Sequence, residues 1–401
     1  MTDYKTYRYR WVILIIYMFV AALTQLYWLN FAAIETYLED SLAVSAIQVG
    51  LLTLVFPIIY IFLSVPSGFI IDKKGFKFGI QIGVLFTGLF SLIRLVNPDS
   101  YICLFIAQLG IAIGQPFILN GITKLVVTWF PPQEEATAVG LGSLALFIGM
   151  IVGLGVTPLL VESAGFKSML LIYGILGILG ILLFSLLVKA KPITPARAIK
   201  EENMPLRSGI AGILRIKNFV ILGFIALIGI GVFNGLATWL EKILNEHQNI
   251  PMIDAGLISG LLIFSGMMGC IAMPIISDKV RRRKPFLILA ASVGTICLIL
   301  LMLPNSFVFN AVNAVILGFF LLPALPIMLT MSVEITGDAF AGISVAYLQL
   351  LGNGAAVAIV PVMEILRNAS KQHILPLAFL ALLLFIAVIL SIRIKETGKA
   401  G

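Results

Sequence analysis

Residues 68–77 read Gly-Phe-Ile-Ile-Asp-Lys-Lys-Gly-Phe-Lys, and residues 274–284 read Pro-Ile-Ile-Ser-Asp-Lys-Val-Arg-Arg-Arg-Lys. Each stretch follows an apolar run that is long enough to cross a bilayer, for which about 20 residues are needed. Both runs are the second of their half of the chain. Two parallel membrane halves, each with an acidic-then-basic loop at the same place, are typical of a solute transporter.

The composition shows which solvent surrounds the chain. Of 401 residues, 60% are hydrophobic and 11% are charged, and the mean hydropathy is +1.09. Soluble domains carry about 25% charged residues, so most of this surface is expected to face lipid. The net charge of +8 does not indicate a nucleic-acid partner, because the basic residues collect in short loops between apolar runs.

Twelve apolar runs divide the chain into two halves. The sequence predicts an N-terminal six-helix bundle at 1–189, a polar cytoplasmic linker at 190–217 and a C-terminal six-helix bundle at 218–401. The linker is rich in proline and charged residues. The predicted spans are 11–35, 46–71, 78–97, 100–129, 136–163, 166–189, 218–242, 253–277, 285–304, 307–333, 340–366 and 373–392.

The basic residues also predict the orientation. Most of the 27 lysines and arginines lie in the N-terminal segment, the loops at 72–77 and 279–284, the linker and the C-terminal segment. Cytoplasmic loops carry such an excess. We therefore expect both termini on the cytoplasmic side of a multi-pass protein of the cytoplasmic (plasma, or inner) membrane. We expect a monomer whose partners are the lipid bilayer and a small-molecule substrate.

The first loop strongly resembles the signature loop of the major facilitator superfamily. Its pattern is Gly-x3-Asp-Lys-x-Gly-x-Lys. The resemblance implies an all-α membrane protein with 12 transmembrane helices in two pseudo-symmetric six-helix bundles, the major facilitator fold. An anchor made only of positive charge is the alternative interpretation.

Five loop residues are expected to gate the cytoplasmic side. Gly68 would let helices approach closely, and Asp72 would bind the positive N-terminal end of the helix at 340–366. Lys73 and Lys77 would pair with acidic neighbours. The second loop keeps Asp278 but departs from the pattern, with proline in place of glycine and a plain basic run after it, so it indicates a clasp less clearly than the first loop.

The middle of the predicted spans contains no carboxylate. Glu334 lies near an inner helix end, and five charged residues lie near outer ends: Arg94, Glu241, Lys242, Glu364 and Arg367. Because a mid-membrane acid is the usual carrier of a coupled proton, this pattern disfavours proton antiport. No nucleophile–base pair or cluster of metal ligands is present at mid-depth either. We therefore expect no enzyme activity, no cofactor and no metal site.

The polar residues at mid-depth are amides and aromatic residues. Uncharged donors beside aromatic faces suit a small polar or cationic solute, since a desolvated cation gains about 2 kcal/mol over such a ring. The alternative is that these groups join helices to one another. The residues are Gln25, Tyr27, Trp28 and Asn30; Gln108, Gln115 and Asn120; Asn234 and Trp239; and Tyr347, Gln349 and Asn353.

Several of these residues lie in patches that resemble the feline leukaemia virus subgroup C receptor-related transporters. That branch is linked to choline, ethanolamine and haem. The patches are Tyr-Trp-Leu-Asn-Phe-Ala-Ala-Ile at 27–34, Gly-Gln-Pro-Phe-Ile-Leu at 114–119 and Gly-x6-Gln-x2-Gly at 342–352. The resemblance implies that Trp28, Gln115 and Gln349 contact the substrate.

Four further residues complete the predicted substrate site. Asn234 stands where that branch has a tyrosine, which weakens an aromatic cage unless Trp239 or Tyr347 replaces it. Asn30 lies two residues after Trp28. The site is expected in a central cavity lined by the helices that carry these residues.

The sequence therefore predicts a facilitative (uniport) or secondary transporter of a small organic solute, including a choline-like amine, that works by alternating access. Two alternatives remain open. A broad-specificity efflux pump for apolar or cationic compounds is suggested by Gly149, Gly153, Gly155 and Pro158, which loosely resemble a glycine-rich antiporter motif. A non-transporting receptor or sensor on the same scaffold is the other.

Overall fold

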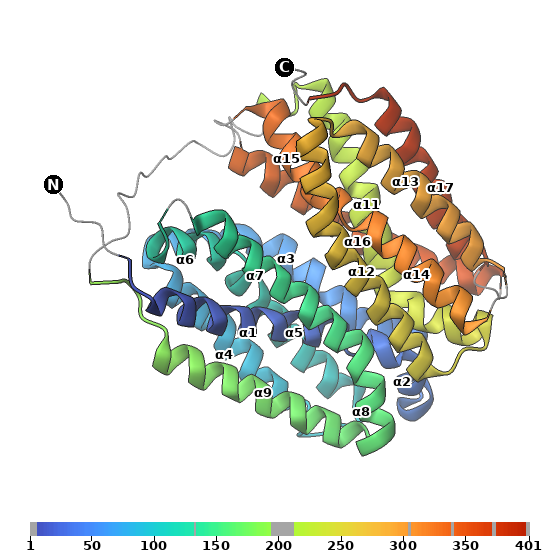
Figure 1. The fold of residues 1–401 in the computed structure, drawn as a ribbon. Helices are drawn as coiled ribbons and strands as arrows, with labels where there is room; N and C mark the ends of the chain where they lie inside the picture. The colour runs from blue at the N-terminus through green and yellow to red at the C-terminus, as the bar shows by residue number, and fades with distance from the viewer. Residues whose placement is uncertain are drawn as a thin grey trace. The chain divides into compact units, whose positions relative to one another are not determined.

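A computed structural model describes residues 6–131, 134–193, 212–303, 306–337, 341–370 and 374–397. The side chains of Asp72, residues 135–136, residues 341–343 and Ser370 lie outside this description. Most of the predicted linker also lies outside it. The chain divides into two compact units, Met1–Glu201 and Glu202–Gly401, which run from blue to green and from yellow-green to red in Figure 1.

Twelve helices in the described part of the chain are long and apolar enough to cross a membrane. They match the twelve predicted spans in number and order. The expectation of an all-α membrane protein is confirmed.

The first unit begins and ends with long helices, and several of its spans are interrupted. Its elements are α1 (Tyr9–Leu29), the short 3₁₀ helix η1 (Ala32–Ile34), α2 (Glu35–Leu42), α3 (Ala46–Lys74), α4 (Phe76–Ile93), α5 (Tyr101–Leu119), α6 (Gly121–Trp129), α7 (Glu135–Ile151), the π-helix η3 (Val152–Val156), α8 (Thr157–Ala164) and α9 (Phe166–Leu187).

The second unit repeats this order with fewer interruptions. Its elements are α11 (Lys217–Lys242), the π-helix η4 (Ile243–His247), α12 (Met252–Val280), α13 (Lys284–Leu301), α14 (Phe307–Leu321), α15 (Ala324–Thr336), α16 (Ala341–Ser370) and α17 (Ile374–Arg393).

Corresponding helices pack in the same pairs in each unit. In the first unit α1 packs on α7, α3 on α5 and α4 on α9. In the second unit the equivalent pairs are α11 with α16, α12 with α14 and α13 with α17. The repeat that the two loops indicated is therefore a repeat of helix packing.

The predicted spans missed four changes in helix geometry. The first span ends as α-helix at Leu29, so that Glu35, the last residue of the predicted span, begins α2 and is buried. The fourth span breaks at Asn120, four residues after Pro116, and the tenth breaks at 322–323, where Pro323 stands. Proline removes a backbone donor and so weakens the helix around it. The fifth span contains η3, and π-helices are frequent at functional sites.

Small residues let the backbones of α1 and α7 touch. A methyl group built on Gly149 would lie 2.0 Å from the carbonyl oxygen of Ala22, and one on Gly153 would lie 3.0 Å from that of Leu26. Glycine at helix crossings is the usual device for close packing in membranes.

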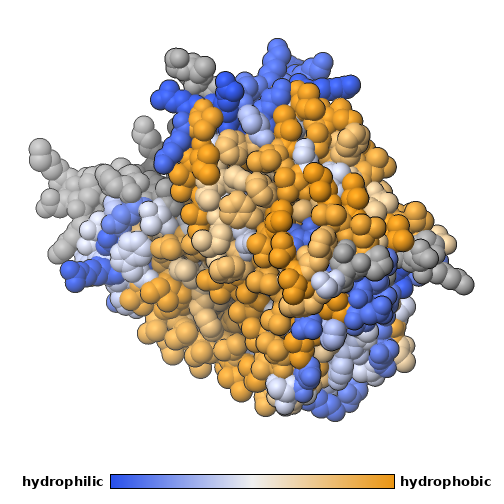
Figure 2. All heavy atoms as spheres, turned by 45° about the vertical axis from the view of Figure 1, so that its right-hand side comes forward, coloured by the Kyte–Doolittle hydropathy of each residue, from blue (hydrophilic) through white to orange (hydrophobic). Residues whose placement is uncertain are grey.

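Figure 2 shows a broad hydrophobic surface, with hydrophilic side chains gathered toward its upper and lower edges. Large hydrophobic residues of the second unit that are more than 40% exposed include Phe264, Ile271, Ile296, Leu382 and Phe385. Such a surface is stable only against lipid, because it would be solvated poorly by water.

Candidate functional site

Trp28 lies in the last turn of α1. Its indole is only 8% exposed, and its Nε1 donates a hydrogen bond of 3.2 Å to the carbonyl oxygen of Thr53 in α3. A buried tryptophan usually finds such a partner for its N–H. The hydrogen bond holds the plane of the ring relative to α3.

Asn30 follows the end of α1 and is completely buried. Its backbone N–H donates to the carbonyl oxygen of Leu26 at 2.9 Å. Neither atom of its side-chain amide has a hydrogen-bond partner among the residues that the structure describes. An unsatisfied buried amide is costly, so this side chain is free to bind a ligand.

Gln115 of α5 is also buried, and its amide forms no hydrogen bond with a described residue. The residue before it, Gly114, lies against Gly83 of α4, where an added methyl group would be 2.5 Å from the carbonyl oxygen. This contact fixes the backbone beside Gln115 and leaves its amide available.

Two other amides of the first unit join helices instead. Asn120 accepts a hydrogen bond from Tyr60 at 2.9 Å and donates to the Ser64 carbonyl at 3.0 Å and to Ser67 at 2.9 Å. Gln108 donates to the carbonyl oxygens of Tyr27 and Leu52, each at 3.1 Å. For these two residues the alternative interpretation, helix-to-helix contact, is the one that the structure supports.

Gln108 also accepts a hydrogen bond from Arg94, for which the sequence indicated only a position near a helix end. Arg94 follows α4 and is completely buried, and its Nη2 donates to Oε1 of Gln108. The guanidinium lies 4.9 Å from the ring centre of Tyr27 and 5.0 Å from that of Phe31. Cation–π contacts with two rings stabilise the charge.

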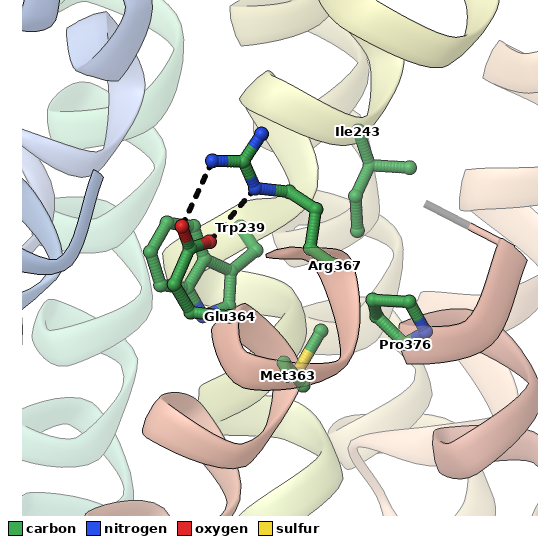
Figure 3. Close-up of a pocket in the computed structure, with 6 residues that line it drawn as sticks. All are labelled: Trp239, Ile243, Met363, Glu364, Arg367 and Pro376. Atoms are coloured by element: carbon green, nitrogen blue, oxygen red, sulfur yellow. Dashed lines mark hydrogen bonds and ion pairs between the residues drawn. The ribbon is translucent and has the colours of Figure 1, made fainter. Parts of the chain in front are cut away.

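In the second unit Trp239 lines a small pocket near the end of α11. Its Nε1 donates to the carbonyl oxygen of Val360 at 3.1 Å, and Lys242 lies 5.9 Å from its ring centre. Figure 3 shows the six lining residues, which come from α11, η4, α16 and α17 and are Trp239, Ile243, Met363, Glu364, Arg367 and Pro376.

Two of the lining residues, Glu364 and Arg367, belong to a network of ion pairs. Arg367 donates to both oxygens of Glu364, at 2.8 and 2.9 Å, and reaches Glu246 at 3.3 Å. Glu246 also lies 3.7 Å from Lys242. Lys242, Glu364 and Arg367 are therefore linked by ion pairs, directly or through Glu246, which is how buried charges become tolerable.

The other candidates of the second unit lie at different depths. Asn234 donates to the carbonyl oxygen of Ile230 in its own helix at 2.8 Å. Tyr347 packs against Phe219, with ring centres 6.0 Å apart. Phe219 precedes Trp239 by 20 residues of α11, roughly 30 Å of helix. Tyr347 and Trp239 therefore do not belong to one aromatic cage.

Gln349 lies closer to the depth of Tyr347 than to that of Asn234. It is half-buried, and its side-chain amide forms no hydrogen bond with a described residue; only its carbonyl oxygen accepts, from Asn353 at 2.9 Å. Gly231 of α11 packs against Ala355 and Ile359 of α16. Asn234, one turn after Gly231, therefore lies beside a part of α16 that comes after Gln349. The residues of the second unit that remain available for a ligand are thus spread along the helices.

The loop at 274–284 is held by hydrogen bonds and ion pairs centred on Arg283. Arg283 donates to Oε1 of Glu334 at 3.0 and 3.1 Å and to Oγ of Ser277 at 3.0 Å, and it pairs with Asp278. Burial lowers the pKa of Arg283, but its hydrogen bonds to Glu334 and Asp278 outweigh this and raise the pKa above its ordinary value.

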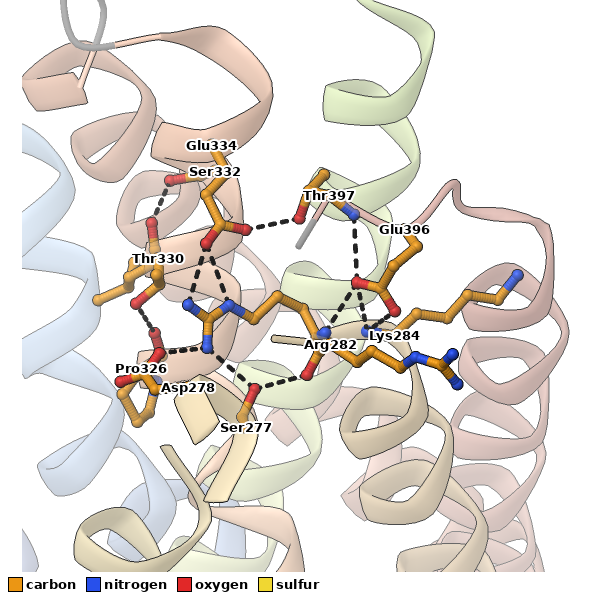
Figure 4. Close-up of polar contacts among 12 residues, drawn as sticks. Ser277, Asp278, Arg282, Lys284, Pro326, Thr330, Ser332, Glu334, Glu396 and Thr397 are labelled. Atoms are coloured by element: carbon orange, nitrogen blue, oxygen red, sulfur yellow. Dashed lines mark hydrogen bonds and ion pairs between the residues drawn. The ribbon is translucent and has the colours of Figure 1, made fainter. Parts of the chain in front are cut away.

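The C-terminal segment joins this network (Figure 4). Glu396 accepts from the backbone N–H of Arg283 at 2.8 Å, and the Thr397 hydroxyl donates to Glu334 at 2.6 Å. The sequence did not indicate which basic residue of this loop would bind Asp278, and the structure places Arg283 there.

The first loop has fewer polar contacts among the described residues. Lys73 lies 5.8 Å from the ring centre of Phe69, and neither it nor Lys77 forms an ion pair there. A methyl group on Gly68 would meet no atom of the described residues within 4 Å. The Asp72 side chain lies outside the described residues.

A different pair connects the same end of the first unit. Arg10 in the first turn of α1 donates to both oxygens of Glu134, each at 2.8 Å. Its guanidinium also lies over Trp11 and Phe130. The sequence did not single out this pair, because its members are 124 residues apart. Groups that could hold a metal ion are absent from the described residues.

Comparisons with known proteins agree with this architecture. The sequence model of the Major Facilitator Superfamily matches residues 12–361. The chain is 28% identical over 357 residues to an uncharacterized MFS-type transporter of Caenorhabditis elegans, covering 84% of this chain and 61% of that protein's length. It is 24% identical over 370 residues to the choline/ethanolamine transporter FLVCR2 of Homo sapiens, covering 86% of this chain and 70% of that protein.

A solved structure has the same fold. It is the crystal structure of a bacterial homolog to the human lysosomal transporter Spinster, in an inward-facing and unoccupied conformation. Its TM-score is 0.78 at 16% identity, with 97% of each chain covered. The expected major facilitator fold and the resemblance to the receptor-related branch are both confirmed, and the fold is that of transporters, which are not enzymes. The chain belongs to the major facilitator superfamily.

Proposed function

We propose that this protein moves a small organic solute across the membrane by alternating access, and that the solute is a choline-like amine. The observation that carries the proposal is the Trp28 indole, which α3 holds through the carbonyl oxygen of Thr53. A fixed aromatic face binds a quaternary ammonium group with about 2 kcal/mol or more when water is excluded.

Two amides of the same unit support the proposal. Asn30 and Gln115 are buried, and their side-chain amides form no hydrogen bond with a described residue. Amides of this kind bind a hydroxyl or an ammonium group without adding charge. The similarity to a protein named a choline/ethanolamine transporter points to the same class of solute.

Sidedness and gating complete the proposal. The basic helix ends of both units, including Arg10 and Arg283, would face the cytoplasm of a plasma membrane by the positive-inside rule. The loop residues Gly68, Asp72, Lys73, Lys77 and Asp278 would gate that side. The protein would act as a monomer and without a cofactor.

The glycine-rich helix does not favour the efflux alternative. Gly149 and Gly153 are required where α7 and η3 meet α1, since a methyl group at either position would press on a carbonyl oxygen of α1. A packing requirement explains these glycines without an antiport function.

The proposal is tested by binding of choline to the purified protein and to two variants. Trp28→Ala should abolish measurable binding, and Trp28→Phe should retain part of it, because phenylalanine keeps a weaker aromatic face. Asn234→Ala is the control, since its amide already bonds to its own helix. Equal affinity in the wild type, Trp28→Ala and Trp28→Phe would contradict the proposal.

A further inference from the structure

Arg94 is the most deeply buried cation of the first unit among the described residues. It is fully enclosed, and its hydrogen bond to Gln108 is made by Nη2 alone, since Nε and Nη1 have no partner among those residues. Its other neighbours are the faces of Tyr27 and Phe31. A charge placed so unfavourably calls for an explanation beyond packing.

The contact with Gln108 has a directional consequence. A side-chain amide can turn over and exchange its oxygen with its nitrogen. Arg94 has only donors, so it can hydrogen-bond to the oxygen of the Gln108 amide but not to its nitrogen. With Oε1 held there, Nε2 must point the other way, toward the carbonyl oxygens of Tyr27 and Leu52.

Those two carbonyl groups precede the two residues that hold the proposed solute site. Tyr27 is followed by Trp28, and Leu52 is followed by Thr53, whose carbonyl oxygen accepts from the Trp28 indole. Gln108 thus connects α1 and α3 at Tyr27 and Leu52, and the indole connects the same helices one residue further along each, at Trp28 and Thr53. The two bridges fix the separation and register of α1 and α3 where the indole lies.

We propose that Arg94 is a positioning residue for the solute site: by fixing the orientation of the Gln108 amide, it holds α1 against α3 and sets the plane of the Trp28 ring. The inference rests on the proposed function where it concerns affinity. Where it concerns the ring itself, it stands on the hydrogen bonds alone.

The test uses a full-length protein in which Trp28 is the sole tryptophan, with Trp11, Trp129 and Trp239 replaced by phenylalanine. Acrylamide quenching of Trp28 reports the position of the ring. Choline is the probe for binding, and thermal unfolding reports stability. The variants are Arg94→Gln, Arg94→Lys and Gln108→Glu. Gln81→Glu is the control, because Gln81 joins α4 to Ser185 by a hydrogen bond of 2.8 Å remote from Trp28 in sequence.

Gln108→Glu separates positioning from stability. The new carboxylate can pair with Arg94, so thermal stability should be kept, but the two donors to Tyr27 and Leu52 are lost. We expect Trp28 quenching to increase and choline affinity to fall about tenfold, the factor that one net hydrogen bond supplies. Arg94→Gln should act in the same direction, whereas Arg94→Lys should restore part of the affinity because its ammonium still donates to Gln108.

Two results would overturn the inference. One is unchanged Trp28 quenching in both Arg94→Gln and Gln108→Glu. The other is a loss of affinity in all variants, including Gln81→Glu, that only follows the loss of thermal stability. If the wild type binds no amine, the proposed function fails, but the quenching experiment still decides whether Arg94 positions the ring.

Discussion

Replacing Arg283 by glutamine should destabilise the second unit. The side chain of Arg283 is only 10% exposed, and it holds Glu334, Ser277 and Asp278 together at the junction of α12 and α13. Glutamine can replace one of these hydrogen bonds at most, and it removes the positive charge that two carboxylates share.

The exposure of the partners sets the magnitude. Breaking a fully buried ion pair costs about 3–5 kcal/mol, whereas an exposed pair contributes about 0–1 kcal/mol. The Asp278 side chain is 62% exposed and can be rehydrated, but that of Glu334 is only 27% exposed. We therefore expect a loss of about 2 kcal/mol, which corresponds to a fall in Tm of about 4–8 °C for a unit of this size.

The assay is thermal unfolding of the detergent-solubilised protein. Arg282→Gln is the matched control. Arg282 is the residue before Arg283, and its guanidinium is exposed and forms no ion pair with a described residue. A double-mutant cycle of Arg283→Gln with Glu334→Gln should give a coupling energy of about 1–2 kcal/mol. If Arg283→Gln and Arg282→Gln unfold at the same temperature, the network does not stabilise this junction and the reasoning is refuted.

Two further predictions concern packing and energy coupling. Gly149→Ala should lower the free energy of unfolding by about 1–3 kcal/mol through overpacking against Ala22. Gly140→Ala, whose methyl group would meet no atom within 4 Å, should instead raise it by up to about 1 kcal/mol through helix propensity. Equal effects of the two substitutions in thermal unfolding would contradict the close packing of Gly149. Uptake of the solute into vesicles should persist without a pH gradient, because no carboxylate lies in the middle of a predicted span; strict dependence of the uptake rate on the gradient would show that a proton is coupled in another way.

The sequence predicted the fold because hydropathy acts locally. Each span can be recognised from its own apolar residues. The structure places the spans predicted at 46–71 and 166–189 within two residues of these predicted bounds. Helix breaks depend on fewer residues and were missed, as at Asn120 and at the end of α1. A π-helix such as η3 has no periodic signal that a stretch of apolar residues would reveal.

The candidate site was predicted less completely. The sequence identified Trp28, Asn30 and Gln115 as polar or aromatic groups at depth, but it could not tell them from Gln108 and Asn120, which bond to neighbouring helices. In the sequence, an amide that contacts a ligand looks the same as an amide that bonds to a neighbouring helix. Only the position of its partners decides between them.

What the sequence determined by itself is the class of this molecule: twelve lipid-facing helices in two repeated halves, with charge at the helix ends. The tertiary structure decided how the charged residues of the loop at 274–284 are paired and which amides bond to neighbouring helices. It placed Arg283 on Asp278 and Glu334, and in the loop at 68–77 it placed Lys73 and Lys74 over phenylalanine rings. The physical reason is range: burial in lipid is a property of each segment, whereas a hydrogen bond or an ion pair depends on groups that lie far apart in the chain and meet only after folding.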